Sequence, residues 1–219
     1  MPESLPAADR AHLLSWLSSV FLREPDAAAV ALMHGPQGDA VVAALAPVPP
    51  LAAEAAALIA ALRRLRQQED DDRSTALRLA GRFATLFLGA SGPNGAHPYA
   101  SVYEDGRTHG AATGRSAAFL AEHHLAVAEG VPEPADHIGI QLAALAALAE
   151  REAAAAAEDP AAADALRAAQ AGFAAAEVRP WIDTFRARVE HDDPDGYYAA
   201  AARLTAAVLE AVAASPVAR

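Results

Sequence analysis

Alanine makes up more than a quarter of this 219-residue chain, and that abundance constrains the fold more than any other feature. Alanine is the best helix former because its side chain loses no rotamer freedom in a helix. The residues that favour strands are scarce, and aromatic residues account for only 5%. The sequence therefore predicts an all-α fold. Because 53% of the residues are hydrophobic, the chain can bury its own core. We expect a single helical domain of roughly nine to eleven helices, in two halves that share a core.

The spacing of apolar residues predicts where the helices lie. Leu13, Leu17, Val20 and Phe21 recur at the interval of one helix face, which predicts a helix over residues 7–22. Proline and glycine separate most of the further helices, because proline lacks a backbone N–H and glycine ends helices. These helices are expected at residues 26–33, 51–67, 73–88, 113–128, 135–157, 160–176, 178–190 and 194–214, with a short one between the turns at 34–38 and 47–50.

Two connections stand apart from this helical pattern. Residues 90–110 are rich in glycine, proline, asparagine and histidine, and we expect no regular structure there. A loop of that length usually carries a function. The linker at residues 129–134 is the predicted boundary and hinge between an N-terminal half, residues 1–128, and a C-terminal half, residues 135–219.

Missing residue types exclude several classes of protein. The chain has no cysteine, which excludes disulfides, iron–sulfur clusters and thiolate zinc sites. Its seventeen basic residues are all arginine, so neither a P-loop lysine nor a Schiff-base lysine exists. The net charge of −11 disfavours nucleic acid as a partner and fits either basic partners or simple solubility. Neither a secretory signal nor a membrane span is expected, which predicts a cytoplasmic protein.

Two segments are unlike the alanine-rich background. In PYASVYEDG, at residues 98–106, Pro98 favours an extended approach, and Tyr99 and Tyr103 flank Ser101. Tyrosine offers a broad apolar face with a polar tip, which suits it to gripping peptide side chains. The same rings could instead pin a long loop to the core. We interpret this segment as part of a binding surface.

The second segment, EPADHIGIQL, begins at Glu133. Pro134 suits a first helical turn, and Asp136 is expected where a carboxylate meets the free amides of that turn. Asp136 could therefore be only a cap. The same location disfavours protonation of His137, and helix geometry places His137 beside Gln141. We interpret both segments as parts of one binding surface.

A catalytic or metal centre is poorly supported. Asp136 and His137 are adjacent on a helix and diverge by roughly 100°, so Asp136 cannot easily orient the imidazole for a triad with Ser101. No Gly-x-Ser-x-Gly elbow is present. His123 and His124 are neighbours that point apart, and no His-Glu-x-x-His motif exists. We therefore expect no metal and no enzymatic activity.

Several motifs together resemble the TorD/DmsD/NarJ family of cytoplasmic chaperones for molybdenum redox enzymes. They are FATLFLG at 83–89, PYASVYEDG at 98–106, EPADHIGIQLAALAAL at 133–148, LLSWLSSVFLREPD at 13–26, RPWIDTFRARV at 179–189 and DGYYAAAARLTAAVL at 195–209. The resemblance spans nearly the whole chain and is closest to the TorD branch, which serves trimethylamine N-oxide and related reductases. One departure lies in GASGPNGAH, at 89–97, where family members often carry more prolines.

The resemblance implies an all-helical chaperone that binds the precursor of a periplasmic molybdoenzyme of the trimethylamine N-oxide or dimethyl sulfoxide reductase type, including its twin-arginine signal peptide. Such chaperones assist insertion of the molybdopterin cofactor, which belongs to the client, and prevent premature export. By motif position, the signature turn corresponds to Pro134, Asp136 and His137, and the binding side of the groove to Phe83, Leu86, Phe87, Tyr99, Ser101 and Tyr103. Pro98, Glu133 and Gln141 complete the predicted binding set.

Other readings stay open beside this one. A helical enzyme or nucleotide-binding module could use Ser101, Asp136 and His137. Some relatives bind guanine nucleotides weakly, but no phosphate-binding motif supports that here, so we expect no cofactor of the chain's own. A structural partner could use the acidic surface as a scaffold. The acidic runs at 69–72 and 190–195 could steer a pair of arginines or could be solvated turns. A monomer and a domain-swapped homodimer are both compatible with the sequence.

Overall fold

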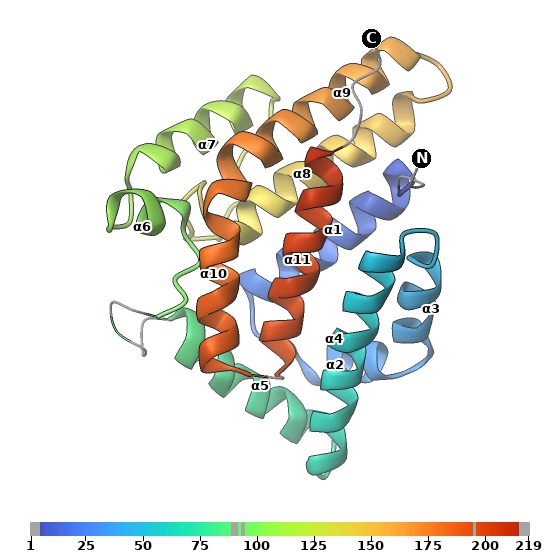
Figure 1. Ribbon diagram of the computed structural model, residues 1–219, viewed down its shortest axis with the longest axis vertical. Coiled ribbons are helices and arrows are strands. Elements are labelled where there is room, and N and C mark those ends of the chain that lie inside the picture. The colour runs from blue at the N-terminus through green and yellow to red at the C-terminus, as the bar shows by residue number, and fades with distance from the viewer. Residues whose placement is uncertain (1–4, 89–91, 93–94, 195, 215–219) are drawn as a thin grey trace. The chain divides into compact units, whose positions relative to one another are not determined.

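The computed structural model of the protein describes residues 5–88, 92, 95–194 and 196–214, and within these ranges all the extended regular elements are helices (Figure 1). Strand-like pairing in the described part of the chain is limited to one antiparallel bridge, between Tyr99 and His137. The all-α prediction is therefore confirmed. Most of the loop that departs from the family pattern, residues 89–91 and 93–94, lies outside the described residues.

The chain forms two compact units that do not follow its order. Unit 1 comprises Met1–Glu3, Arg23–His97 and Thr184–Ala207. Unit 2 comprises Ser4–Leu22, Pro98–Asp183 and Val208–Arg219. Residues 129–134 lie inside unit 2. The helix at 7–22 belongs to the same unit, where it packs against the helix that begins at Ile138. The division into halves at 1–128 and 135–219, with a hinge at 129–134, stays a prediction.

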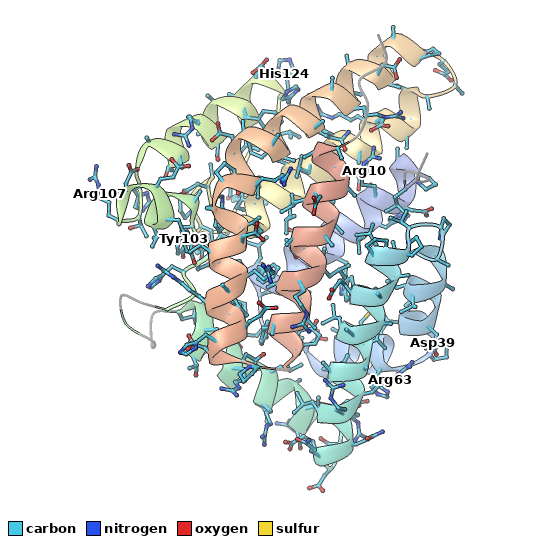
Figure 2. All side chains as sticks on the ribbon, viewed as in Figure 1. Arg10, Asp39, Arg63, Tyr103, Arg107 and His124 are labelled. Atoms are coloured by element: carbon cyan, nitrogen blue, oxygen red, sulfur yellow. The ribbon has the colours of Figure 1, made fainter. Side chains whose placement is uncertain are left out.

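Unit 1 contains four helices that lie between Arg23 and His97. They are α2 (Ala27–His34), α3 (Pro36–Ala44), α4 (Pro49–Gln68) and α5 (Asp72–Phe87). The carboxylates of Asp26 and Asp71 accept backbone N–H bonds at the starts of α2 and α5, at 2.8 and 2.7 Å, which satisfies amides that a helix leaves unpaired. Helices α3 and α4 begin with proline and pack side by side (Figure 1). Asp39 and Arg63 link these two helices by an ion pair of 2.8 Å (Figure 2).

Aromatic rings fill the core of unit 1. Phe87 packs edge-on against Tyr198, with ring centroids 5.3 Å apart, and it also contacts Phe83 and Phe185. The Tyr198 hydroxyl donates to the carbonyl oxygen of Leu79 at 3.2 Å, which satisfies its polar tip inside the core. These rings join α5 to α10 (Arg179–Asp192) and α11 (Tyr197–Ala213). Both of those helices begin in one unit and end in the other.

Unit 2 is organised around α8, a helix that is buried on most of its surface. Its helices are α1 (Ala7–Leu22), α6 (Ala100–Asp105), α7 (Ala111–Glu122), α8 (Ile138–Ala155) and α9 (Pro160–Phe173). Helix α8 packs against both α1 and α9 (Figure 1). Gly139 lets α1 approach closely, because a Cβ atom there would lie only 2.5 Å from Cγ of Leu22. The Ser18 hydroxyl donates to the carbonyl oxygen of Gly139 at 2.7 Å and fixes this contact.

A buried polar network ties α1, α8 and α9 together. The guanidinium of Arg10, labelled in Figure 2, donates to the carboxylate of Glu152 and, at 3.1 Å, to the side-chain oxygen of Gln170. Arg167 donates to the second oxygen of Glu152 at 2.9 Å, and Gln170 to the first at 2.8 Å. Glu152 is only 1% exposed, but every oxygen of its carboxylate is paired, as a buried charge requires.

Several expectations about helix limits are wrong, among them the end of α7, which lies at Glu122 and not at residue 128. The stretch at 90–110 is not wholly irregular, because α6 occupies Ala100–Asp105. So short a helix is unstable alone, and it depends on a distant cap that the sequence does not reveal. The helices expected at 160–176 and 178–190 are also continuous, through a π-helical turn at Ala174–Val178. That turn ends two residues before Pro180, whose missing N–H would otherwise interrupt an α-helix.

Candidate functional site

The two unusual segments lie side by side within unit 2. The backbone N–H of Ala100 donates to the carbonyl oxygen of Asp136 at 3.1 Å, and that of Ile138 donates to the carbonyl oxygen of Pro98 at 2.8 Å. These two bonds form the antiparallel bridge between Tyr99 and His137. The structure therefore brings together two segments that are about 35 residues apart, at the start of α6 and the start of α8.

Asp136 caps a different helix from the one expected. Helix α8 begins at Ile138, so Asp136 precedes it, instead of lying in its first turn. The Asp136 carboxylate is fully buried and accepts the backbone N–H of Ser101, in the first turn of α6, at 2.9 Å. It also accepts the hydroxyl of Thr113, on α7, at 2.8 Å. The carboxylate thereby stabilises α6 through its free amides and positive dipole end and holds α7 beside it.

His137 is the N-cap residue of α8. Its Nδ1 accepts the backbone N–H of Gly139 at 3.0 Å, so the proton of the neutral ring is on Nε2. Burial lowers the pKa of His137 to about 4, although the charge of Asp136 opposes the change. The imidazole is therefore neutral near pH 7. Its ring meets the Tyr99 ring edge-on, with centroids 5.2 Å apart.

Ser101 and Gln141 are buried beneath this junction. The side-chain amide of Gln141 donates to the hydroxyl of Ser116, on α7, at 3.1 Å. Among the described residues, the buried Ser101 hydroxyl and the buried Gln141 amide oxygen have no hydrogen-bond partner. Sequence reasoning missed Thr113 and Ser116, because a threonine and a serine on a helix carry no signal of their distant partners.

The three residues of the considered triad do not form a catalytic chain. Asp136 bonds to the amide of Ser101 and to Thr113, and Nδ1 of His137 is occupied by Gly139. All three side chains are at most 3% exposed, so a substrate cannot reach them. Within the described residues, no group of three or more acidic or histidine side chains is arranged to hold a metal ion.

Only some of the residues predicted to bind a peptide reach the surface of unit 2. Tyr99, Tyr103, Glu133 and Pro134 are partly exposed. The Tyr99 hydroxyl donates to the Glu133 carboxylate at 2.7 Å, and burial together with this bond raises the pKa of Tyr99 well above its usual value. Tyr103, labelled in Figure 2, stacks on Trp181, and their ring centroids are 5.3 Å apart. This surface pairs an aromatic ring with a carboxylate, a combination that suits a guanidinium group.

The remaining predicted residues lie in unit 1. Phe83, Leu86 and Phe87 are 5% exposed or less, and they pack in the core of that unit. These residues recur on one side of α5, and that spacing indicates a buried helix face. A role for them in binding stays a prediction.

The acidic runs are mostly used within the fold. Asp71 caps α5, Asp72 pairs with Arg66 at 2.6 Å, and Glu69 pairs with Arg78 at 3.1 Å. Asp193 is buried and accepts the backbone N–H of Tyr198 at 3.1 Å. Residue 195, the last of the second run, lies outside the described residues. These pairs leave little carboxylate free for steering a ligand.

Over the described part of the chain, no helix combines the length and the apolar character that crossing a membrane requires.

Comparison with known proteins defines first the class of fold and then the family. The fold is similar to that of a crystal structure from Archaeoglobus fulgidus, provisionally described as a redox enzyme maturation protein, with a TM-score of 0.50 and 22% identity over 92% of this chain and 93% of the other. The family model for the nitrate reductase delta subunit matches residues 48–187. The Chaperone protein TorD of Vibrio cholerae serotype O1 is 35% identical over 92% of this chain and 89% of its own length. That of Shewanella loihica is 31% identical over 90% and 87%.

The chain therefore belongs to the TorD/DmsD/NarJ family of molybdoenzyme maturation chaperones, as its motifs predicted. The relatives are named as chaperones, in agreement with the expectation that this protein is not an enzyme.

Proposed function

We propose that this protein is a cytoplasmic chaperone for the precursor of a molybdenum redox enzyme of the trimethylamine N-oxide or dimethyl sulfoxide reductase type. It would bind the precursor with its twin-arginine signal peptide, assist cofactor insertion and delay export. The membership of the TorD family supports the chaperone role. The molybdopterin cofactor would belong to the client, and the proposal assigns no cofactor to this chain.

The observation that carries the signal-peptide part of the proposal is the pairing of Tyr99 with Glu133. Their hydroxyl and carboxylate lie 2.7 Å apart at a partly exposed edge of unit 2. A peptide guanidinium could stack on the Tyr99 ring and donate to Glu133, which combines a cation–π contact with a charge-assisted hydrogen bond. The buried Asp136 and His137 would act beneath this edge as its scaffold, because the Asp136 carboxylate bonds to Ser101 of the other segment and the His137 ring packs against Tyr99.

Binding of a synthetic twin-arginine signal peptide, measured by titration calorimetry, tests this proposal. Replacing Glu133 with Gln removes the carboxylate charge while keeping the side chain's size. A hydrogen bond to a charged group contributes about 1.5–3 kcal/mol, so we expect affinity to fall roughly 10- to 100-fold. Tyr99→Leu removes the aromatic face and should also weaken binding.

A matched control is Glu129→Gln, which removes an exposed carboxylate from the same connection. This variant should bind the peptide as the native chain does. A peptide with both arginines replaced by glutamine should bind at least about tenfold more weakly. Equal affinity of the native chain for both peptides would refute the arginine-recognition proposal, and so would native affinity in Glu133→Gln.

A further inference from the structure

The connection from the end of α7 to the start of α8, which can be followed in Figure 1, covers a small apolar cluster of unit 2. The buried side chains of this cluster come from both helices and include Leu120, Ile140 and Ala144. Val127 and Val131, on the connection, pack against the cluster and remain partly exposed. We call residues 126–132 the strap.

The chain is firmly held just before the strap begins. His124, labelled in Figure 2, has the left-handed conformation, with φ of 51°. The backbone N–H of Leu125 then donates to the carbonyl oxygen of Leu120 at 2.8 Å, which ends α7 in a Schellman motif. Arg151, on α8, donates to the carbonyl oxygen of His123 at 2.6 Å. These bonds fix the first end of the strap.

The chain is also held where the strap ends. The carboxylate of Glu133, the next residue, accepts the Tyr99 hydroxyl at 2.7 Å. The antiparallel bridge between Tyr99 and His137 fixes the turn that follows. Both ends of the strap therefore have polar anchors on neighbouring elements of unit 2.

The strap between these anchors makes no hydrogen bond to the rest of the protein. Anywhere in the described ranges, the backbone N–H groups of residues 126–130 find no protein acceptor. The N–H of Val131 donates to the carbonyl oxygen of Ala128 at 3.1 Å, but that bond is internal to the strap. Only apolar contacts, chiefly those of Val127 and Val131, hold the strap down.

Those apolar contacts do not fill the space beneath the strap. A recess of about 180 Å³ remains between the strap and α8, and Val127, Val131, Ile140 and Ala144 are among its lining residues. Protein interiors are normally packed without such gaps, so the contacts across this recess are fewer than those of a closed core. Sparse apolar contacts and a backbone bonded to solvent are the features of segments that open without global unfolding.

We propose that the strap opens as a local unit of the folded protein, while both of its ends stay fixed, and uncovers the apolar surface of Ile140 and Ala144. Val131 precedes Glu133 by two residues, which span no more than about 7 Å of chain. The uncovered surface would therefore lie beside the edge at which peptide binding is proposed, and access to it would require a conformational step. The opening is a property of the chain alone and does not depend on that binding.

Single cysteines can measure the opening, because the chain has no thiol of its own. Ala144→Cys lies beneath the strap, and Ala146→Cys, on the same helix, is the matched control, since both alanines are 4% exposed but only Ala144 lines the recess. The reagent is a fluorescein maleimide, which is too large to enter the closed recess. We expect Ala144→Cys to react at least about tenfold faster than Ala146→Cys. Low concentrations of urea should leave the faster rate unchanged, because local opening exposes little surface.

A second pair of variants tests whether the valines hold the strap down. Val127→Ala/Val131→Ala removes part of the apolar contact and should speed the reaction of Ala144→Cys roughly tenfold. The control, Val41→Ala/Val42→Ala, changes two equally half-buried valines of α3 and should leave that rate unchanged. All four valines are partly exposed, so both double variants should fold, which circular dichroism checks.

Three results would overturn the proposal. Equal rates for Ala144→Cys and Ala146→Cys, with the same dependence on urea, would show that the cluster is uncovered only by global unfolding. Reaction of Ala144→Cys as fast as that of Ala128→Cys, on the exposed side of the strap, would show that the surface is never covered. An unchanged rate in Val127→Ala/Val131→Ala would show that these valines do not hold the strap.

Discussion

The carboxylate of Asp136 accepts the backbone N–H of Ser101 at 2.9 Å, across 35 residues of chain. Through this bond the turn before α8 caps α6, and the hydroxyl of Thr113 adds α7 to the same carboxylate. Asp136, the acidic residue of the Asp-His pair, therefore has a structural role, because it holds α6 and α7 to the turn before α8. The neighbouring His137 packs against Tyr99, which bonds to Glu133 at the proposed binding edge.

Replacing Asp136 with alanine should strongly destabilise the protein. The change leaves the Ser101 amide and the Thr113 hydroxyl without their buried acceptor, and each unsatisfied group costs about 1–3 kcal/mol. We expect a total loss of about 2–4 kcal/mol in the free energy of unfolding, measured by urea denaturation. Asp70→Ala, at an exposed aspartate, should change it by less than about 0.5 kcal/mol. Equal effects of the two substitutions would contradict the capping role.

Glu152→Ala should cost about 3–5 kcal/mol, because it leaves the buried guanidinium of Arg10 without its charge partner. Replacing both residues, as Arg10→Met/Glu152→Leu, removes the whole charge pair. This double variant should recover much of the loss. The coupling free energy from a double-mutant cycle checks the network directly, and additive single effects would count against it.

The carboxylate of Glu152 should make the stability of the folded protein sensitive to acid. Burial alone would raise the pKa of Glu152, but the bonds from Arg167 and Gln170 and the charge of Arg10 outweigh burial and lower it. A lowered folded-state pKa stabilises the protein above the ordinary value of 4.5, and this contribution is lost as the pH falls below it. Urea denaturation from pH 6 to pH 3 should show a smaller acid-induced loss in Arg10→Met/Glu152→Leu than in the native chain.

His137 should remain neutral until the pH approaches 4. Since its pKa is lowered from 6.5, the unfolded chain binds a proton that the folded chain does not. The contribution of neutral His137 to the free energy of unfolding is fully present above pH 6.5, and it is lost as the pH falls towards 4. One pKa unit corresponds to about 1.4 kcal/mol, so the loss should reach about 3 kcal/mol. NMR titration of the imidazole measures the pKa itself.

Two variants separate His137 from other titrating groups. His137→Gln should flatten the stability profile between pH 6.5 and 4, whereas His12→Gln, at an exposed histidine of α1, should leave it unchanged. An imidazole that titrates near 6.5 in the folded protein would show that the ring is not buried in solution as it is in the structure.

Two glycine-to-alanine substitutions should have opposite effects. At Gly81 the new methyl group meets nothing within 4 Å, and replacing an exposed helical glycine should stabilise the protein by about 0.5–1 kcal/mol. At Gly139 the methyl group would lie 2.5 Å from Cγ of Leu22 and 3.1 Å from the carbonyl oxygen of Ser18. We expect a loss of about 1–3 kcal/mol as α1 is pushed from α8. Thermal unfolding measures both, and stabilisation by Gly139→Ala would contradict the close contact.

Local patterns predicted the elements of this fold well. The helix at residues 7–22 was placed at its observed limits, because its apolar spacing and the following proline are both local signals. The limits of α8 were less well predicted, since its start depends on His137 acting as a cap. Helix α6 was missed because its cap comes from Asp136, on a segment far along the chain.

For the candidate site, the sequence singled out the two segments because their residues differ from an alanine-rich background. It could not tell that Asp136, His137, Ser101 and Gln141 are buried, while Tyr99 and Glu133 reach the surface. Burial depends on which helices cover a side chain, and that is a long-range property.

The sequence by itself determined the helical class, the family and the two segments that matter, because composition, spacing and motifs are properties of neighbouring residues. Only the tertiary structure decided that α1 packs on α8, that Asp136 caps α6, and that the chain divides into two units of interleaved segments. Each of these depends on a contact between distant residues. Such contacts form only when burial and hydrogen bonding together offset the conformational entropy lost in bringing the residues together.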